Sequence, residues 1–357
     1  MVKEVGAWVS DEVVSIRWAE SNAGRGFERL RHRLALWFGA TLVLFACAAR
    51  AGPPVPLTIG YQTEIEPSKA VQADGMLEHD GSAKITWKRF DSGADVIAAL
   101  ASNSIQIGYL GSAPLAAAVT RQLPIRVVFI ASLIGDAEAM VVRPAITGPS
   151  DLLGKHIATP FASTAHYSLL AALHHWGITT SQVKIVNLRP PEIIAAWARG
   201  DIDAAYVWDP ALGNLKETGH VLARSADVAE WGSPTFDVWV ARNDFAAMHG
   251  AVVTAFVAAI GRENAAYRDD PKTWLAKNLD HITGLTGARA ADVPGILAGS
   301  YFPLLDEQAS PKFLGHDTAA AIAATSAFLH DAVSGPAPLA DYTAYIDAHF
   351  VAAAAGH

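Results

Sequence analysis

The chain has 357 residues, of which 51% are apolar and 17% are charged, a composition typical of a globular protein long enough for two domains. Its formal net charge is −8, and it has no run of five or more Lys or Arg residues, which argues against a nucleic-acid partner. Cys47 is its only cysteine, so no internal disulfide can form and the rest of the chain offers no thiolate metal site or cysteine nucleophile. Beyond the N-terminal region no stretch reaches eighteen uncharged apolar residues, and none is predicted to span a membrane.

Residues 1–51 are predicted to be a signal peptide with an over-extended start. Three arginines between positions 29 and 33 precede the sixteen uncharged residues 34–49, and an Ala-x-Ala pattern ends at Ala51. A basic segment, an apolar segment and small residues in this order are typical of an export signal. We therefore expect cleavage after Ala51 and a mature protein in the periplasm.

Two alternatives stay open for this region. The first is a short membrane anchor, although the uncharged segment is shorter than a typical span. The second is a lipoprotein, in which cleavage would free Cys47 for acylation, but the bulky Phe45 is unfavourable in front of such a site. Lipid anchoring through Cys47 is therefore the less favoured alternative.

Residues 56–120 alternate between apolar runs with strand character and segments with helical spacing. The predicted strands are residues 57–61, 85–90 and 105–110. The predicted helices are residues 67–77, residues 94–102 and a helix that begins at residues 111–114. Strands that alternate with helices predict a parallel α/β sheet.

A second, similar unit begins after residues 139–143. Its predicted strands are residues 156–159, 183–188 and 204–208. Its predicted helices are residues 148–152, 165–176 and 191–199. The extended segment 235–241 follows, and helices rich in Ala continue to the end of the chain.

The order of these elements predicts an α/β protein with two lobes. The chain leaves the first lobe near Met140 and returns near Trp239, so lobe 1 comprises residues 52–139 and 240–357 and lobe 2 comprises residues 140–239. The two crossing strands form a hinge, and a small ligand is expected in the cleft between the lobes. In open α/β sheets the loops that follow the strands face such a cleft.

Several ordered runs resemble the taurine-binding proteins of bacterial ABC importers, a branch of a family that also includes binders of alkanesulfonates, nitrate and pyrimidines. These runs are residues 61–63 (YQT), 90–93 (FDSG), 107–115 (IGYLGSAPL), 164–173 (TAHYSLLAAL), 194–197 (IAAW) and 206–208 (YVW). The taurine branch is also what residues 193–197 and 235–239 most resemble. One departure is Asp209, where the family leads us to expect a smaller residue and where a carboxylate could alter selectivity.

The resemblance implies a two-lobe periplasmic-binding-protein fold, type II-like, with the ligand in the inter-lobe cleft. It implies the binding component of an ABC importer, a monomer without cofactor or metal, which hands taurine to an inner-membrane permease driven by an ATPase. The alternatives are a binder of another alkane- or aromatic sulfonate and a non-transport sensor with the same fold.

Taurine has a tetrahedral sulfonate at one end, and helix N-termini suit such an anion because they present unpaired N–H groups and a partial positive charge. The sequence offers two such starts, one in each lobe: Gly111 with Ser112, and Ser163 with Thr164. If both helix starts bind the same anion, closure of the cleft is coupled to ligand binding. The alternative is that Ser112 and Ser163 only cap their helices. The resemblance favours the binding role.

The ammonium group at the other end of taurine needs carboxylates or aromatic faces once water has left. Asp237 is the best candidate, because an acidic residue inside an apolar run needs a partner. Trp208 and Trp239 are further candidates and are expected to lie near Asp237. The alternative for Asp237 is a local ion pair with Arg242.

Three further polar residues complete the predicted site. Glu66 follows the first strand, where it would bind the ammonium or stand in the first turn of the next helix, stabilised by the helix dipole. Gln62 and Glu138 are the other two candidates.

An enzyme is not expected. The chain lacks Gly-x-Ser-x-Gly, the phosphate-binding Gly-x₄-Gly-Lys-Ser/Thr loop and His-Glu-x-x-His. The adjacent His174 and His175 point to different sides of their helix, which is a poor arrangement for a metal. One enzyme class with this lobe architecture, which makes a thiamine pyrimidine, uses a Cys-rich segment, and no cysteine follows Cys47.

Overall fold

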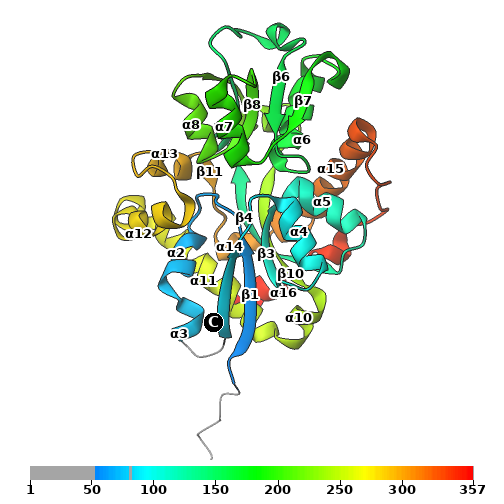
Figure 1. The fold of residues 1–357 in the computed structure, drawn as a ribbon. Helices are drawn as coiled ribbons and strands as arrows, with labels where there is room; N and C mark the ends of the chain where they lie inside the picture. The colour runs from blue at the N-terminus through cyan, green and yellow to red at the C-terminus, as the bar shows by residue number, and fades with distance from the viewer. Residues whose placement is uncertain (1–52, 80–82, 357) are drawn as a thin grey trace, which may run out of the picture. The chain divides into compact units, whose positions relative to one another are not determined.

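The structure is a computed structural model that describes residues 53–79 and 83–356. The predicted signal peptide, its cleavage site at Ala51 and Cys47 lie outside the described residues. The described part of the chain forms two β-sheets, each flanked by helices (Figure 1).

The first sheet has six strands: β1 (Val55–Tyr61), β2 (Ala83–Arg89), β3 (Ile107–Gly111), β4 (Ile125–Ile134), β10 (Phe236–Arg242) and β11 (Ser300–Tyr301). Their order across the sheet is β11-β4-β10-β3-β1-β2. Strand β1 pairs in parallel with β2 and β3, whereas β10 runs antiparallel to β3 and β4, and β11 runs antiparallel to β4.

The second sheet has five strands: β5 (Glu138–Val142), β6 (His156–Thr159), β7 (Lys184–Asn187), β8 (Ala204–Trp208) and β9 (His220–Arg224). Their order is β7-β6-β8-β5-β9. Strand β6 pairs in parallel with β7 and β8, and β5 runs antiparallel to β8 and β9.

Helices flank both sheets. The second sheet is accompanied by α6 (Thr164–His175), α7 (Pro190–Arg199), α8 (Ala211–Lys216) and α9 (Ser225–Glu230). The first sheet is accompanied by α2 (Ser68–Asp74), α3 (Met76–His79), α4 (Gly93–Ala101), α5 (Ser112–Thr120), α10 (Asn243–Met248), α11 (Gly250–Asp269), α12 (Pro271–Thr286), α13 (Val293–Ala298), α14 (Leu305–Gln308), α15 (Asp317–Val333) and α16 (His349–Ala355). Short turns η1 (Pro149–Leu152), η2 (Thr180–Gln182), η3 (Pro311–Gly315) and η4 (Thr343–Tyr345) complete the described elements.

Each sheet has its own apolar core, and we call each sheet with its helices a lobe. The core of lobe 1 includes Ile59, Leu110 and Trp239, and the core of lobe 2 includes Ile157 and Val207. Every residue of β3 and β8 is buried, as expected for central strands that are covered on both faces. The predicted α/β architecture with two sheets is confirmed.

The chain passes between the sheets twice. Residues 135–137 join β4 of lobe 1 to β5 of lobe 2, and residues 231–235 lead from α9 back to β10. Strands β5 and β10 therefore extend across the expected boundaries after residues 139 and 239, and Trp239 lies within the sheet of lobe 1.

Other details differ from the predicted elements. The helix expected over residues 67–77 is interrupted at Gly75, whose φ of 58° is left-handed, so that α2 and α3 are separate. Strands β4, β9 and β11 are additional. The apolar run of β4 lacks a distinctive period, because a buried strand and a buried helix segment look alike in sequence.

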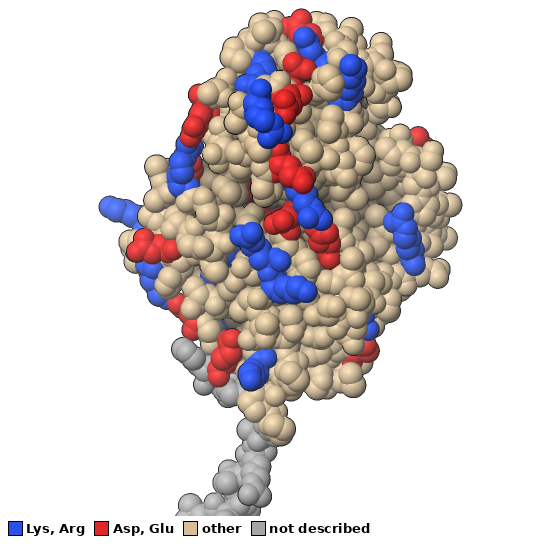
Figure 2. Space-filling view, viewed as in Figure 1, with Lys and Arg blue, Asp and Glu red and all other residues tan. Residues whose placement is uncertain are grey.

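The surface of the described residues carries charges of both signs. On the face drawn in Figure 2, Lys and Arg side chains lie interspersed with Asp and Glu, without a broad area of one sign. No helix in the described part of the chain has the length and apolar character needed to cross a membrane.

Candidate ligand-binding site

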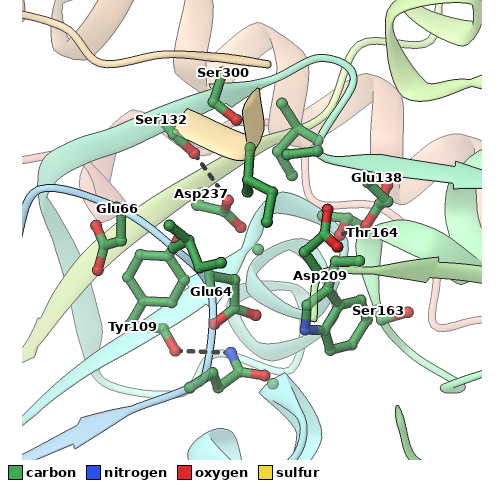
Figure 3. A pocket seen from close by; sticks show the side chains of 18 of the residues that line it. Glu64, Glu66, Tyr109, Ser132, Glu138, Ser163, Thr164, Asp209, Asp237 and Ser300 are labelled. Carbon is green, nitrogen blue, oxygen red and sulfur yellow. Dashed lines mark hydrogen bonds between the residues drawn. The ribbon is translucent and has the colours of Figure 1, made fainter. Parts of the chain in front are cut away.

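A cavity of about 50 Å³ lies between the two lobes. Lobe 1 contributes residues from the ends of β1, β3, β4 and β10, and lobe 2 contributes the start of β5, the start of α6 and the end of β8. Eight of the ten predicted site residues line it: Gln62, Glu66, Gly111, Glu138, Ser163, Thr164, Trp208 and Asp237. The expected inter-lobe location therefore brings most of the predicted residues together (Figure 3).

The loop after β1 supplies Gln62 and Glu66. The Gln62 Nε2 donates to the carbonyl oxygen of Tyr109 at 3.2 Å, and the buried Lys69 Nζ donates to the Gln62 carbonyl oxygen at 3.0 Å. The Glu66 carboxylate accepts from Ser68 Oγ at 2.5 Å and lies 3.5 Å from Lys69 Nζ. Glu66 is thus already paired with a cation inside lobe 1.

The same loop carries Glu64, which was not among the predicted site residues. Part of its side chain remains exposed, but its Oε2 is buried and has no hydrogen-bond partner among the described residues. Burial, followed by the negative charge of Asp237, raises the pKa of Glu64 to about 8. Its position in the loop directly after a buried strand, two residues from Glu66, was the only available signal in the sequence.

Asp237 lies on β10, where it pairs in register with Gly111 at the end of β3. Ser132 Oγ donates to Asp237 Oδ2 at 2.9 Å. Burial raises the pKa of Asp237 to about 7, although the Ser132 hydroxyl opposes the shift. The alternative pairing with Arg242 is wrong, because that guanidinium binds Asp244 at 2.7 Å and the carbonyl oxygen of Leu100.

The two predicted helix starts lie close together beside the cavity. Helix α5 begins after Gly111, and helix α6 begins after Ser163, whose Oγ accepts from His166 N at 3.1 Å. Ser163 therefore caps its helix and also lines the cavity. Gly111 and Thr164 come into close contact, because a Cβ added to Gly111 would lie 2.5 Å from Thr164 Cγ2.

Ser112 differs from the expectation. It is the first residue of α5 rather than its cap, it is fully buried, and its Oγ accepts from Phe236 N at 3.4 Å. Its side chain does not line the cavity. Its contribution to a ligand would come from the backbone amide at the start of the helix.

Glu138 lies at the start of β5 and is fully satisfied by hydroxyl groups. Thr164 Oγ1 donates to it at 2.6 Å, Ser225 Oγ at 2.7 Å and Ser168 Oγ at 3.2 Å. Burial raises its pKa, and these three hydrogen bonds oppose the shift. This arrangement fixes the position of Thr164 beside the cavity.

The two predicted tryptophans differ. Trp208 lines the cavity from the end of β8. Trp239 does not reach it, because it is fully buried and packs edge-on against Tyr109 and Phe256, with ring centroids 5.2 and 5.0 Å apart. Trp239 packs behind Tyr109, and it is Tyr109 that lines the cavity. The direct binding role expected for Trp239 is therefore not supported by its position.

Asp209 lies between the cavity and a larger outer hollow of about 570 Å³, and it lines both. Its Oδ1 accepts from Gly213 N at 2.8 Å, and burial raises its pKa to about 6. The outer hollow holds an ion pair between Arg289, which follows α12 in lobe 1, and Glu217, which follows α8 in lobe 2. A second ion pair between lobes joins Arg189 Nη2 and Asp95 Oδ1 at 3.2 Å.

The cavity is strongly acidic. Five carboxylates line it: Glu64, Glu66, Glu138, Asp209 and Asp237. No Lys, Arg or His is among the described residues that line it, so its positive potential comes from the helix starts and from the buried Lys69 beside Glu66. The described residues contain no group of three or more His, Cys, Asp or Glu placed to hold a metal ion.

Comparisons with known proteins identify the family of this chain. The family model for the substrate-binding domain of ABC-type glycine betaine transport systems matches residues 55–269. The taurine-binding periplasmic protein of Escherichia coli (strain K12) is 46% identical over 314 residues, which cover 87% of this chain and 97% of that protein. A putative aliphatic sulfonates-binding protein of the same strain is 27% identical over 249 residues, covering 68% of this chain and 76% of that protein.

Solved structures confirm the fold. The alkanesulfonate-binding protein SsuA from Xanthomonas axonopodis pv. citri, bound to MOPS, superposes with a TM-score of 0.68 at 23% identity, covering 85% of this chain and 99% of that chain. The desulfurization enzyme DSZB superposes with a TM-score of 0.58 at 18% identity, covering 85% of this chain and 99% of that chain. The fold is therefore used by a further enzyme besides the class considered from the sequence, so the fold alone does not separate binding from catalysis.

Proposed function

Because this chain belongs to the family of ABC-type substrate-binding domains, we propose that it captures taurine, 2-aminoethanesulfonate, for an importer. The curated relative that is 46% identical over most of both chains is named a taurine-binding periplasmic protein. The observation that carries the proposal is the charge distribution of the cavity. It has two helix starts on one side and, on another, carboxylates of which Glu66 alone among the described residues is paired with a cation. A zwitterion with a short linker matches this distribution, whereas a simple anion matches only half of it.

The helix starts supply the sulfonate subsite in this proposal. The first turns of α5 and α6 direct unpaired amides toward the anion. The Ser163 and Thr164 hydroxyls lie at the same place. Because α5 belongs to lobe 1 and α6 to lobe 2, a sulfonate that accepts from both favours the closed arrangement of the lobes over the open one.

The carboxylates of lobe 1 supply the ammonium subsite. Glu66 already has Lys69 as a partner, and Glu138 is satisfied by three hydroxyls. Asp237 and Glu64 remain the carboxylates best able to accept from an ammonium, and the face of Trp208 offers a further favourable contact.

The cellular role follows from the family. We propose that the protein acts in the periplasm as a monomer, performs no chemistry on its ligand, and delivers it to an inner-membrane permease and its ATPase.

Calorimetric titration of the purified mature protein with taurine, ethanesulfonate and sulfate tests this proposal. We expect taurine to bind at least tenfold more tightly than ethanesulfonate, because ethanesulfonate leaves the buried carboxylates without a cation. Sulfate is expected to bind more weakly than either. Equal affinity for taurine and ethanesulfonate would show that the acidic side of the cavity does not recognise an amine.

A further inference from the structure

Among the five carboxylates of the cavity, Glu64 has a distinct environment. Each of the other four accepts at least one hydrogen bond from a side chain or backbone group: Glu66, Glu138, Asp209 and Asp237. Among the described residues the Glu64 carboxyl, in contrast, accepts only from its own backbone N–H, and its Oε2 is buried without a partner. A buried acceptor without a partner is costly, and more so when it is charged.

The charges that face Glu64 make its ionised form still less favourable. Asp237 from β10 and Glu66 from its own loop are negative and raise its pKa, whereas Lys69 from α2 lowers it. Lys69 is already engaged, because its ammonium lies 3.5 Å from the Glu66 carboxylate and donates to the Gln62 carbonyl oxygen. Figure 3 shows Glu64 and Asp237 on the same side of the pocket, with the Tyr109 ring beside them.

We infer that Glu64 exchanges its proton for the ammonium group of the ligand. In the empty cavity Glu64 is a neutral carboxylic acid. When an amine-bearing sulfonate enters, its ammonium takes the place of the missing partner, the Glu64 O–H bond breaks, and the proton leaves to solvent. The ligand keeps all three of its ammonium protons, so that Glu64 releases one proton for each ligand bound. This inference rests on the proposed function, because it assumes a ligand that carries an ammonium group.

The exchange gives the site a selectivity that depends on pH. With a pKa of about 8 in the empty cavity, Glu64 is about 90% protonated at pH 7. Binding that releases a proton becomes tighter as pH rises, so the proton of Glu64 alone is expected to lower the Kd for taurine by up to about tenfold from pH 6 to pH 7, and ionisation of Asp237 adds to this change. A sulfonate without an amine finds the neutral acid, releases no proton and gains no affinity over this range.

Calorimetry in two buffers measures this proton directly. Taurine is titrated at pH 7 into the full-length mature protein in phosphate and in Tris, whose ionisation enthalpies differ widely. The difference in apparent binding enthalpy divided by the difference in buffer ionisation enthalpy gives the number of protons released. For the unaltered protein we expect a release of about one proton from Glu64 for each taurine, plus up to about half a proton from Asp237, whose pKa of about 7 leaves it half protonated at pH 7.

The Glu64→Gln variant removes the titrating group with little change in shape. We expect it to release at least about 0.5 protons fewer for each taurine than the unaltered protein (an order-of-magnitude expectation from linkage), with the remainder coming from Asp237, whose pKa is about 7, and to bind taurine at least tenfold more weakly. Glu230→Gln is the matched control, because Glu230 is an exposed residue at the end of α9; it should leave both the affinity and the proton release unchanged.

Each outcome separates the inference from the proposed function. Tight taurine binding without proton release in the unaltered protein would overturn the inference and leave the proposed function intact. Unchanged proton release in Glu64→Gln would overturn it as well, because another group would then supply the proton. Failure of the unaltered protein to bind taurine would overturn the proposed function itself. If Glu64→Gln does not fold, the absence of proton release in the unaltered protein would still overturn the inference.

Discussion

Gly111 and Thr164 are the closest contact between the two helix starts that flank the cavity. A Cβ on Gly111 would lie 2.5 Å from Thr164 Cγ2, a separation that side chains do not tolerate. Thr164 cannot retreat freely, because its Oγ1 donates to the buried Glu138 at 2.6 Å. The arrangement of lobes in the structure therefore requires a residue without a side chain at position 111.

Gly111→Ala is expected to impair closure rather than folding. The added methyl group would push the start of α6 away from the start of α5, so that a sulfonate could no longer accept from both. We expect taurine affinity to fall at least tenfold, by the cost of overpacking a tight contact, with little change in melting temperature. Titration calorimetry and thermal unfolding measure the two quantities. Gly148→Ala is the control, since no atom lies within 4 Å of a Cβ there; an equal loss of affinity in both variants would argue against a closure contact.

Asp237→Asn is expected to weaken taurine much more than ethanesulfonate. The variant keeps the shape of the side chain and its contact with Ser132 but removes the charge that would face the ammonium. Loss of one partner of a buried charge pair costs about 2–5 kcal/mol, which corresponds to a loss of at least thirtyfold for taurine. Ethanesulfonate should change less than about threefold by the same reasoning. If both ligands lose affinity equally, Asp237 has a structural role only.

The stability of the ligand-free protein should fall as pH rises from 5 to 8. Glu64 has a folded-state pKa of about 8 against an ordinary value of 4.5, so the folded protein holds more protons than the unfolded chain in this window. Its contribution to stability is complete below about pH 4.5 and is lost as pH rises through 8, with a total on the order of 3 kcal/mol over this window. His166 acts in the opposite direction up to about pH 6.5, because burial lowers its pKa from 6.5 to about 4. Carboxylates with lowered pKa values also act in the opposite direction, but their contribution is complete above about pH 5; they are Asp151, Asp244, Asp270, Glu307 and Asp341.

Thermal unfolding at several pH values checks this dependence. Glu64→Gln should show a clearly shallower decline between pH 5 and 8 than the unaltered protein, because the titrating group is gone. Some decline should remain, since the pKa of Asp237 is also raised, to about 7. Identical slopes in the two proteins would mean that Glu64 is ionised in the folded state.

Arg289 is expected to control release of the ligand. It joins Glu217 of lobe 2 across the outer hollow, beyond Asp209. Both side chains are about half exposed, so the pair should add less than about 1 kcal/mol to the stability of the fold. Arg289→Ala should nevertheless speed taurine dissociation about two- to fivefold in stopped-flow experiments, in line with such an energy. Arg199→Ala removes an ion pair with Asp201 that stays within lobe 2 and should not change the rate.

The sequence predicted those parts of the site that have a regular local signal. The starts of α5 and α6 were visible because small and hydroxyl residues precede helical spacing, and Asp237 was visible because a charge inside an apolar strand is unusual. Trp239 was wrongly predicted to line the ligand site because it lies near Asp237 in the sequence. The two residues are two positions apart on β10, a distance of about 6–7 Å along the strand. At that depth Tyr109 and Phe256 cover it completely, and only the tertiary packing shows this.

Glu64 was missed for the opposite reason. It lies in an irregular loop after β1, where neither strand nor helix periodicity predicts which side chains are buried. Its importance comes from partners that are remote in sequence, since Asp237 approaches it from β10. The role of Ser132 as donor to Asp237 likewise depends on the pairing of β4 with β10, and the apolar run of β4 did not reveal its pairing in advance.

A crystal structure of the protein with taurine tests the division of the cavity most directly. We predict that the taurine nitrogen lies about 3 Å from carboxylate oxygens of Glu64 and Asp237, at hydrogen-bonding distance. The sulfonate oxygens should lie at a similar distance from backbone amides at the starts of α5 and α6. A ligand bound in the reverse orientation, with its sulfonate toward Glu64 and Asp237, would contradict this prediction.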